Sequence, residues 1–317
     1  MKWLIAVLMC LLLALPVSAE KRIALTFDDV PRQPGGFMDA DARAGRLVRA
    51  LRRAGVRQAA FFVTVGNLGQ PGTGNGAAHI ARYVRAGHVI ANHSFAHQRL
   101  SGMTAAAYLA DIDRAQVWLQ GRPGLRPWFR FPFLDEGGRD KAKRDAVRAG
   151  LAARGLSNGY VTAEASDWNI DALASAARQA GKRIDMAALR DLYVESHVEA
   201  AEFYDALAVK TLGRSPVHVM LLHETDLAAL FVGDLVRALR ARGWRIVTAD
   251  TAYADPIAKL RPDTPAAQGT LTEALAWEKG LPAPRWYARN DLRIADPLFR
   301  ERVLGEAPAA TSAPDVP

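Results

Sequence analysis

The sequence has only one cysteine, Cys10, among its 317 residues. Cys10 lies in an N-terminal segment that we expect to be removed, so the mature chain would contain no cysteine. This lack excludes disulfides and thiolate catalysis. Any metal ion would have to be held by histidine and carboxylate side chains.

Three other features are missing. Beyond residue 19, no apolar run is long enough to span a membrane, so no integral membrane span is expected in the mature chain. The glycine-rich segment 66–76 lacks the Gly-Lys-Ser/Thr ending of a phosphate-binding loop. No basic run is interleaved with aromatic residues, so we expect no nucleic-acid partner. The formal charge of +8 could favour an anionic polymer, but most of the excess is arginine dispersed along alanine-rich helical segments.

The N-terminal segment 1–19 has the features of a secretory signal peptide. Lys2 precedes an apolar run over 4–15, and the small residues of 17–19 match a cleavage site before Glu20. An uncleaved anchor is disfavoured because the run is short, and a lipoprotein signal at Cys10 is disfavoured by the preceding Met9. We therefore expect a periplasmic or secreted protein. Export without disulfides fits a bacterial envelope.

Short apolar runs alternate with helical patterns about seven times, which predicts an α/β fold with parallel strands and crossover helices. The count favours a distorted (β/α) barrel of about seven strands over an open sheet, and such barrels reach this length as one domain. The expected strands are 23–27, 59–65, 88–92, 127–133, 157–162, 217–222 and 244–248. The expected helices are 41–54, 77–86, 104–120, 141–153 and 227–241.

Two regions depart from the alternating pattern. Residues 170–213 predict a helical insertion without a strand. From residue 251 onward prolines and polar residues replace the pattern, which predicts a C-terminal extension over 251–317 with a short helix at 271–279. Its end, 306–317, is rich in alanine and proline and predicts a disordered tail. The barrel domain is accordingly expected over 20–250.

Residues suited to chemistry stand at the ends of five expected strands. In (β/α) barrels the active site forms at the C-terminal ends of the strands, so these residues are expected to meet there. Adjacent carboxylates such as Asp28 and Asp29 repel each other unless a cation is present or one of them is protonated. Without other evidence, such a pair more often belongs to a solvated turn. The strand-end residues are Asp28, Asp29, His93, His97, Arg130, Phe133, Asp167, Trp168 and His223.

The pair His93 and His97 has the spacing H-x3-H, which places both imidazoles on one side of a helix or tight turn. Two neutral imidazoles and one carboxylate, with positions open for water, suit a catalytic divalent ion, most simply Zn²⁺. The spacing alone is a weak signal because such pairs occur by chance. Its position after a strand, with paired aspartates at another strand end, favours a metal site.

Together the motifs TFDD, HSFAH, RFPF, SDW and LLH resemble, in order, the five motifs of the polysaccharide deacetylase family (the NodB-homology domain, carbohydrate esterase family 4). The resemblance covers roughly residues 22–249. It departs from the family pattern at Phe133, where tyrosine is common, and at Glu164, where aspartate is common.

The resemblance implies a role for each motif residue. Asp28 corresponds to the catalytic base, Arg130 to the arginine that orients it, and His223 to the general acid. The remaining correspondences are Asp29, His93 and His97 as metal ligands, Asp167 as the carboxylate that tunes the catalytic histidine, Trp168 in the substrate groove, Leu221 in the acetyl pocket, and the backbone N–H near Phe133 at the oxyanion.

The activity implied is metal-dependent removal of N-acetyl groups from an amino-sugar polysaccharide, either peptidoglycan or an exopolysaccharide. Two alternatives remain open at this point. One is a polysaccharide O-acetyl esterase that uses the same metal site. The other is a non-catalytic envelope carbohydrate-binding protein built on a barrel that has lost its activity. Loss of activity usually removes the base, a metal ligand or the acid, and all of these are present here.

Overall fold

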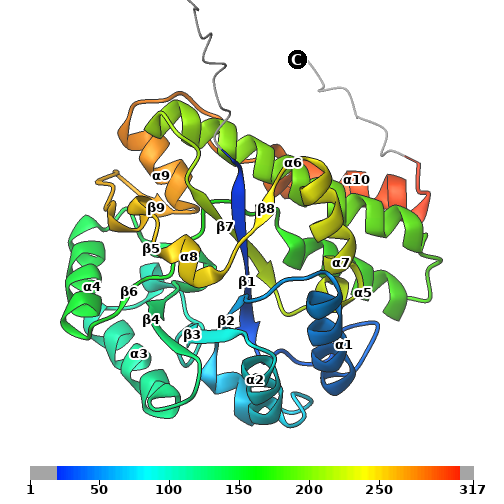
Figure 1. Ribbon diagram of the computed structural model, residues 1–317, viewed down its shortest axis with the longest axis horizontal. Coiled ribbons are helices and arrows are strands. Elements are labelled where there is room, and N and C mark those ends of the chain that lie inside the picture. Colours follow the sequence, from blue (N-terminus) through cyan, green and yellow to red (C-terminus); the bar gives the residue numbers. More distant parts are fainter. Residues whose placement is uncertain (1–19, 308–317) are drawn as a thin grey trace, which may run out of the picture.

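The computed structural model describes residues 20–307; the expected signal peptide and most of the expected tail lie outside the described residues. Its main sheet has seven parallel strands in the order β6–β4–β3–β2–β1–β7, with β8 also paired to β1 (Figure 1). These strands are β1 (Arg22–Val30), β2 (Ala60–Val63), β3 (Val89–Asn92), β4 (Leu125–Phe129), β6 (Ser157–Asn158), β7 (Val217–His223) and β8 (Arg245–Ile246). A separate antiparallel pair consists of β5 (Asp135–Gly138) and β9 (Ala267–Gln268).

Helices surround the sheet and connect its strands. The α-helices are α1 (Ala40–Arg53), α2 (Gly76–Arg85), α3 (Ala105–Leu119), α4 (Lys141–Ala153), α5 (Asp167–Gln179), α6 (Met186–Leu212), α7 (Asp226–Ala241), α8 (Ala249–Tyr253), α9 (Leu271–Glu278) and α10 (Leu292–Leu304). Short 3₁₀ helices are η1 (Val65–Gly69), η2 (Leu100–Gly102), η3 (Pro132–Leu134), η4 (Pro256–Lys259) and η5 (Ala288–Asn290). None of the helices within residues 20–307 has the length and apolar character needed to cross a membrane.

The two edges of the sheet approach each other through the chain that follows β6. Thr162 N and Ala163 N donate to the Val219 carbonyl at 3.0 and 3.1 Å, and Leu221 N donates to the Ala163 carbonyl at 2.9 Å. This segment therefore crosses from β4 to β7. The sheet curls into a distorted barrel, as predicted from the alternation of strands and helices.

Short polar residues fix where the crossover helices begin. Asp39 accepts a hydrogen bond from Ala42 N at the start of α1, and Thr225 accepts one from Ala228 N at the start of α7. Such caps satisfy backbone N–H groups that have no partner inside the helix. α7 can therefore begin directly after the end of β7, whereas a loop separates the end of β1 from the start of α1.

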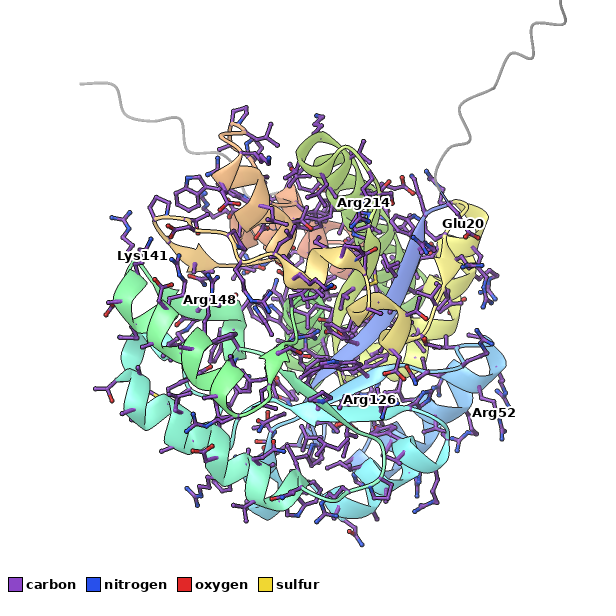
Figure 2. All side chains as sticks on the ribbon, turned by 60° about the vertical axis from the view of Figure 1, so that its left-hand side comes forward. Glu20, Arg52, Arg126, Lys141, Arg148 and Arg214 are labelled. Atoms are coloured by element: carbon purple, nitrogen blue, oxygen red, sulfur yellow. The ribbon has the colours of Figure 1, made fainter. Side chains whose placement is uncertain are left out.

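Four basic side chains hold the segment after β8 against the rest of the fold (Figure 2). Arg126 binds its partner carboxylate through two hydrogen bonds of 2.7 and 2.8 Å. Exposed pairs of this kind contribute little individually, at most about 1 kcal/mol, but together they fix the position of the segment. The contacts are Arg126–Asp250, Lys141–Asp263, Arg148 with the Pro262 carbonyl, and Arg214–Asp255.

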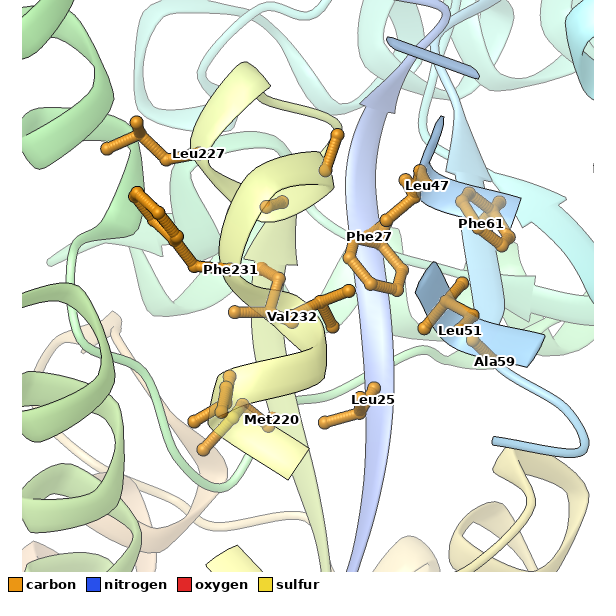
Figure 3. Close-up of a cluster of buried hydrophobic side chains, with 14 of the residues drawn as sticks. Leu25, Phe27, Leu47, Leu51, Ala59, Phe61, Met220, Leu227, Phe231 and Val232 are labelled. Atoms are coloured by element: carbon orange, nitrogen blue, oxygen red, sulfur yellow. The ribbon is translucent and has the colours of Figure 1, made fainter. Parts of the chain in front are cut away.

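The main core lies between β1, β2 and β7 on one side and α1 and α7 on the other (Figure 3). Phe27 and Phe61 stack with ring centroids 5.0 Å apart, which joins the first two strands. Leu47 of α1 and Val232 of α7 are fully buried in the same cluster. The mostly apolar run 23–27 of β1 suits this packing, because the strand is covered on both faces.

Replacing Leu47 by alanine is expected to lower the free energy of unfolding by about 2–5 kcal/mol, because it leaves a cavity in the packed core. Urea unfolding measures the change. Val117→Ala is the matched control; this side chain is 81% exposed, and its truncation should change stability by less than about 0.5 kcal/mol. Equal effects of the two substitutions would contradict the assignment of Leu47 to the core.

The structure differs from the sequence-based expectation in detail. The expected strand 127–133 ends at Phe129, because the chain turns into η3 at Pro132, and β6 is only two residues long. The expected insertion 170–213 consists of two helices, α5 and α6, and α5 already begins at Asp167. In the C-terminal extension the helix over 271–279 is present as α9, whereas β9 and α10 were not predicted.

Candidate active site

The predicted site residues meet at the C-terminal ends of the strands. Asp28 and Asp29 belong to the end of β1, His93 follows β3, Arg130 follows β4, and His223 ends β7. Most of them line one pocket of about 430 Å³, while Arg130 and Asp167 lie behind its wall and contact residues that line it. The pocket is lined by Asp28, Asp29, Arg32, His93, His97, Arg99, Phe133, Leu134, Glu164, Ser166, Trp168, Leu221, His223, Gln268 and Gly269.

Asp29, His93 and His97 form a cluster whose three potential ligand atoms all lie within 4.8 Å of one another. Asp29 Oδ1 is 3.4 Å from His93 Nε2 and 2.9 Å from His97 Nε2. His93 Nδ1 lies 2.9 Å from the Arg130 carbonyl, which can only accept, so Nδ1 carries the proton. The lone pair on His93 Nε2 therefore points into the cluster, an arrangement typical of metal-binding histidines.

The residues of this cluster fit a divalent cation. Asp29 Oδ1 is buried and receives no hydrogen bond within residues 20–307, although two imidazole nitrogens approach it. Asp29 and His97 also hold left-handed backbone conformations, with φ of 65° and 51°, which cost free energy in non-glycine residues and concentrate at functional sites. A cation between the three side chains would compensate the orphaned oxygen.

The ionised form of Asp29 is favoured. Burial alone would raise its pKa, but contacts with His93 and His97 and the charge of Arg32 hold the pKa well below its usual range. The Arg32 guanidinium donates to Asp29 Oδ2 at 2.7 Å. The second carboxylate oxygen is thereby occupied, which leaves Oδ1 as the oxygen that faces the imidazoles.

Asp28 is held by a buried arginine rather than by the histidine cluster. Arg130 Nη1 donates to Asp28 Oδ1 at 2.6 Å, and the Asp28 Oδ2 atom lies 3.6 Å from His93 Nε2. The other acceptors of the guanidinium are Thr26 Oγ1, the Gly159 and Tyr160 carbonyls and the Tyr253 hydroxyl. With its guanidinium saturated in this way, Arg130 fixes one oxygen of Asp28 and leaves the other directed toward the metal cluster.

His223 and Asp167 form a second buried pair at the pocket. His223 Nδ1 and Asp167 Oδ1 are 2.7 Å apart, and Asp167 Oδ2 accepts from the His223 backbone N–H at 2.8 Å. Burial lowers the pKa of His223, but the charge and hydrogen bond of Asp167 outweigh it and raise the pKa to about 9. Burial would raise the pKa of Asp167, but the charge and hydrogen bonds of His223 lower it. Near neutral pH His223 is therefore an imidazolium whose Nε2–H remains available.

Apolar and aromatic side chains complete the pocket. Leu221 is buried at its base, whereas Phe133 and Trp168 are 46% and 42% exposed. The Phe133 ring lies 4.6 Å from the His97 ring and carries the Arg99 guanidinium 4.1 Å above it. Phe133 has a φ of 59°, so the chain turns sharply beside the metal cluster. All three residues predicted as substrate-binding lie at the pocket.

Some pocket residues were not predicted as site residues. Arg32 and Arg99 each follow a motif by only a few positions, so proximity in sequence could have suggested them. Glu164 also lies at the pocket, where burial raises its pKa. Gln268 and Gly269 reach the pocket because β9 pairs with β5, a long-range pairing that no local sequence pattern indicates.

Residues 17–153 match the sequence model of the polysaccharide deacetylase family. This match covers less than half of the chain, and over that segment it agrees with the resemblance that the motifs predicted. The matched segment includes Asp28, the cluster of Asp29 with the two histidines, and Arg130. It ends before Asp167 and His223, whose place at the site rests on the geometry described above.

The similar solved structures include the following three. A family 4 carbohydrate esterase from Streptomyces lividans in complex with acetate is 21% identical, with coverage of 73% of this chain and 95% of that chain and a TM-score of 0.48. The peptidoglycan deacetylase PdaC from Bacillus subtilis is 19% identical, with 73% and 89% coverage and a TM-score of 0.46. A BA3943 mutant, described as a CE4 family pseudoenzyme with restored enzymatic activity, is 16% identical, with 74% and 68% coverage and a TM-score of 0.50.

At these identities the likeness concerns the fold alone. Comparison with curated proteins gives no match.

Proposed function

We propose that this chain is a metal-dependent hydrolase that removes N-acetyl groups from an amino-sugar polysaccharide, peptidoglycan or an exopolysaccharide, in the periplasm or outside the cell. The observation that carries the proposal is the convergence on one pocket of three separate units. These are the cluster of Asp29 with its two histidines, the arginine-bound Asp28, and His223 with its carboxylate partner.

Asp29, His93 and His97 would hold a divalent ion, most simply Zn²⁺, because the donor set is two imidazoles and one carboxylate. When bound, the ion lowers the pKa of water and polarises the acetyl carbonyl. Asp28 accepts the proton of the attacking water with its Oδ2 atom, while Arg130 holds Oδ1 and so fixes the orientation of the carboxylate. Adjacent aspartates thus have separate roles.

His223 donates a proton to the leaving nitrogen from its free Nε2, and Asp167 stabilises the imidazolium before that transfer. An amine leaves an amide only once it is protonated, so a strongly basic histidine favours N-deacetylation over O-deacetylation. Leu221 would contact the acetyl methyl group and Trp168 the sugar ring. The backbone N–H near Phe133 would stabilise the developing oxyanion.

A screen for acetate release tests the proposal. Purified protein is incubated with acetylated chitooligosaccharides, peptidoglycan and acetylxylan, before and after treatment with a chelator. Acetate from the amino-sugar substrates that disappears with chelator and returns with added Zn²⁺ supports the proposal. Release from acetylxylan alone would favour an O-acetyl esterase, and glycan binding without acetate from any substrate would favour a binding protein.

The rate of deacetylation is expected to fall as pH rises through the pKa of His223, because only the imidazolium can donate a proton. The negative charge of Asp29 contributes to the raised pKa of His223, and a cation bound at the cluster would offset this contribution. The alkaline limb should therefore lie between the ordinary histidine pKa of about 6.5 and the raised value of about 9. Asp167→Asn removes the main cause of the elevation and should move this limb to lower pH. A pH profile of kcat measures the shift, and an unchanged limb in the variant would contradict the role of His223.

A further inference from the structure

A second cavity, of about 640 Å³, lies between α1 and α7 and shares no lining residue with the active-site pocket. Five arginines surround it, and we call it the arginine groove. Its lining consists of Arg46, Arg49, Ala50, Arg53 and Ala54 of α1 and its end, and Ala229, Leu230, Gly233, Asp234, Val236, Arg237 and Arg240 of α7.

The helical repeat explains why these arginines gather. Arg46, Arg49 and Arg53 are spaced three and four residues apart, so they lie on one face of α1. The opposite face carries Leu47 and Leu51, which are buried in the core. Small residues on both helices form the floor of the arginine groove, so the long side chains stand around an open space.

The groove is poor in compensating charge. Asp234 is its only acidic lining residue, and it binds Arg237. Arg240 donates a hydrogen bond to the Ala54 carbonyl at 2.7 Å, and Arg46 donates one to the Ala229 carbonyl at 3.3 Å. Because a carbonyl is neutral, neither contact compensates the positive charge of the arginine. Within residues 20–307, neither Arg49 nor Arg53 has an ion-pair partner.

A sixth arginine, Arg82 of α2, lies outside the lining of the groove and interacts with Asp41, but it also approaches Arg49. The guanidinium groups of Arg49 and Arg82 converge over Gly45, where a Cβ atom would lie 3.2 and 3.1 Å from their Nη1 atoms. Two guanidinium groups that approach each other repel, so a nearby anion would stabilise them. Arginines that are dispersed along two helices in the sequence thus gather around one cavity in the fold.

We infer that the arginine groove binds an anionic ligand that carries several closely spaced phosphate groups. A cleft lined by one sign of charge concentrates counter-ions of the opposite sign. Guanidinium groups bind phosphate oxygens in a bidentate manner, so several of them around one cavity suit a ligand with more than one phosphate. This site would act independently of acetyl hydrolysis.

Binding of inorganic tripolyphosphate, measured by isothermal titration calorimetry at about 0.15 M salt, tests the inference. The variant R49S/R53S removes the two arginines without ion-pair partners and should weaken binding at least about tenfold. The matched control is R52S/R300S, which removes the same charge from exposed arginines outside the groove. Arg52 lies on the surface of the molecule (Figure 2). We expect the control to bind within about twofold of the unchanged protein.

Further experiments distinguish a lipid from a soluble or polymer-borne phosphate ligand. Co-sedimentation with phosphatidylglycerol vesicles, whose surface presents many neighbouring phosphates, that is lost in R49S/R53S would support a lipid surface as the source of the phosphates. Tripolyphosphate binding without vesicle binding would support a soluble or polymer-borne ligand. Absence of saturable tripolyphosphate binding, or equal weakening in both double variants, would overturn the inference. Acetate release should be unchanged in R49S/R53S, which also shows that this variant is folded.

Discussion

Asp28→Asn is expected to lower the rate of deacetylation by about 10²–10⁴-fold, the usual contribution of a general base, while the bound metal is retained. Asn preserves the shape of the side chain and can still accept the hydrogen bond from Arg130, but it cannot take a proton from water. The metal should remain because Asp28 is outside the cluster of three ligands. Acetate release and metal content, measured on the same preparation, check both parts.

The control for this substitution is Asp140→Asn, at the exposed start of α4, where asparagine caps a helix as well as aspartate does. It should alter neither rate nor metal content. Because Asp28→Asn leaves the buried charge of Arg130 without its carboxylate, thermal unfolding should be measured as well. Loss of metal from a folded Asp28→Asn protein would mean that Asp28 is a ligand and that the two acids do not have separate roles.

His97→Ala is expected to abolish stoichiometric metal binding and to reduce acetate release by roughly 10³-fold, since metal activation supplies several kcal/mol of transition-state stabilisation. His97 supplies one of only three side-chain donors, and its Nε2 is 2.9 Å from Asp29 Oδ1. Elemental analysis after dialysis measures the metal, and the acetate assay measures the rate.

Two further variants make this result interpretable. His97 has a φ of 51°, which alanine tolerates poorly and asparagine tolerates better, so His97→Asn separates loss of the imidazole from distortion of the loop. The neighbouring exposed Gln98→Ala should keep both metal and activity. Full activity in either His97 variant would rule out the proposed metal site.

Much of the barrel could be predicted because its strands contain short, mostly apolar runs that alternate with helical patterns ending at glycine. β1 and β7 are examples, since each is buried along nearly its whole length. β5 and β9 could not be predicted, because Asp135–Gly138 has no apolar alternation and the two strands pair across distant parts of the chain. α10 contains Pro297, which conceals its helical pattern.

The candidate site could be predicted where chemistry coincides with a strand end. Asp28 and Asp29 alone do not indicate a metal site, and the spacing of His93 and His97 was needed to predict one. In the structure Asp29 lies close to both histidines. The assignment of one acid to the metal and the other to the proton stays a prediction, and the distances are consistent with it. Arg32 lies close to a motif in sequence, but its contact with Asp29 depends on the turn after β1 and so became evident only in the structure.

The pairing of β5 with β9 has a consequence for the order in which the pocket is completed during synthesis. A growing chain emerges N-terminus first, and all the motif residues have been made once His223 is added. Gln268 and Gly269 come later, and Gly269 N donates to the Leu134 carbonyl at 3.2 Å to hold that wall of the pocket in place. The residues that complete this wall of the pocket are therefore added to the growing chain after all the motif residues. A chain that stops short of residue 269 would carry the full set of catalytic side chains beside an open wall.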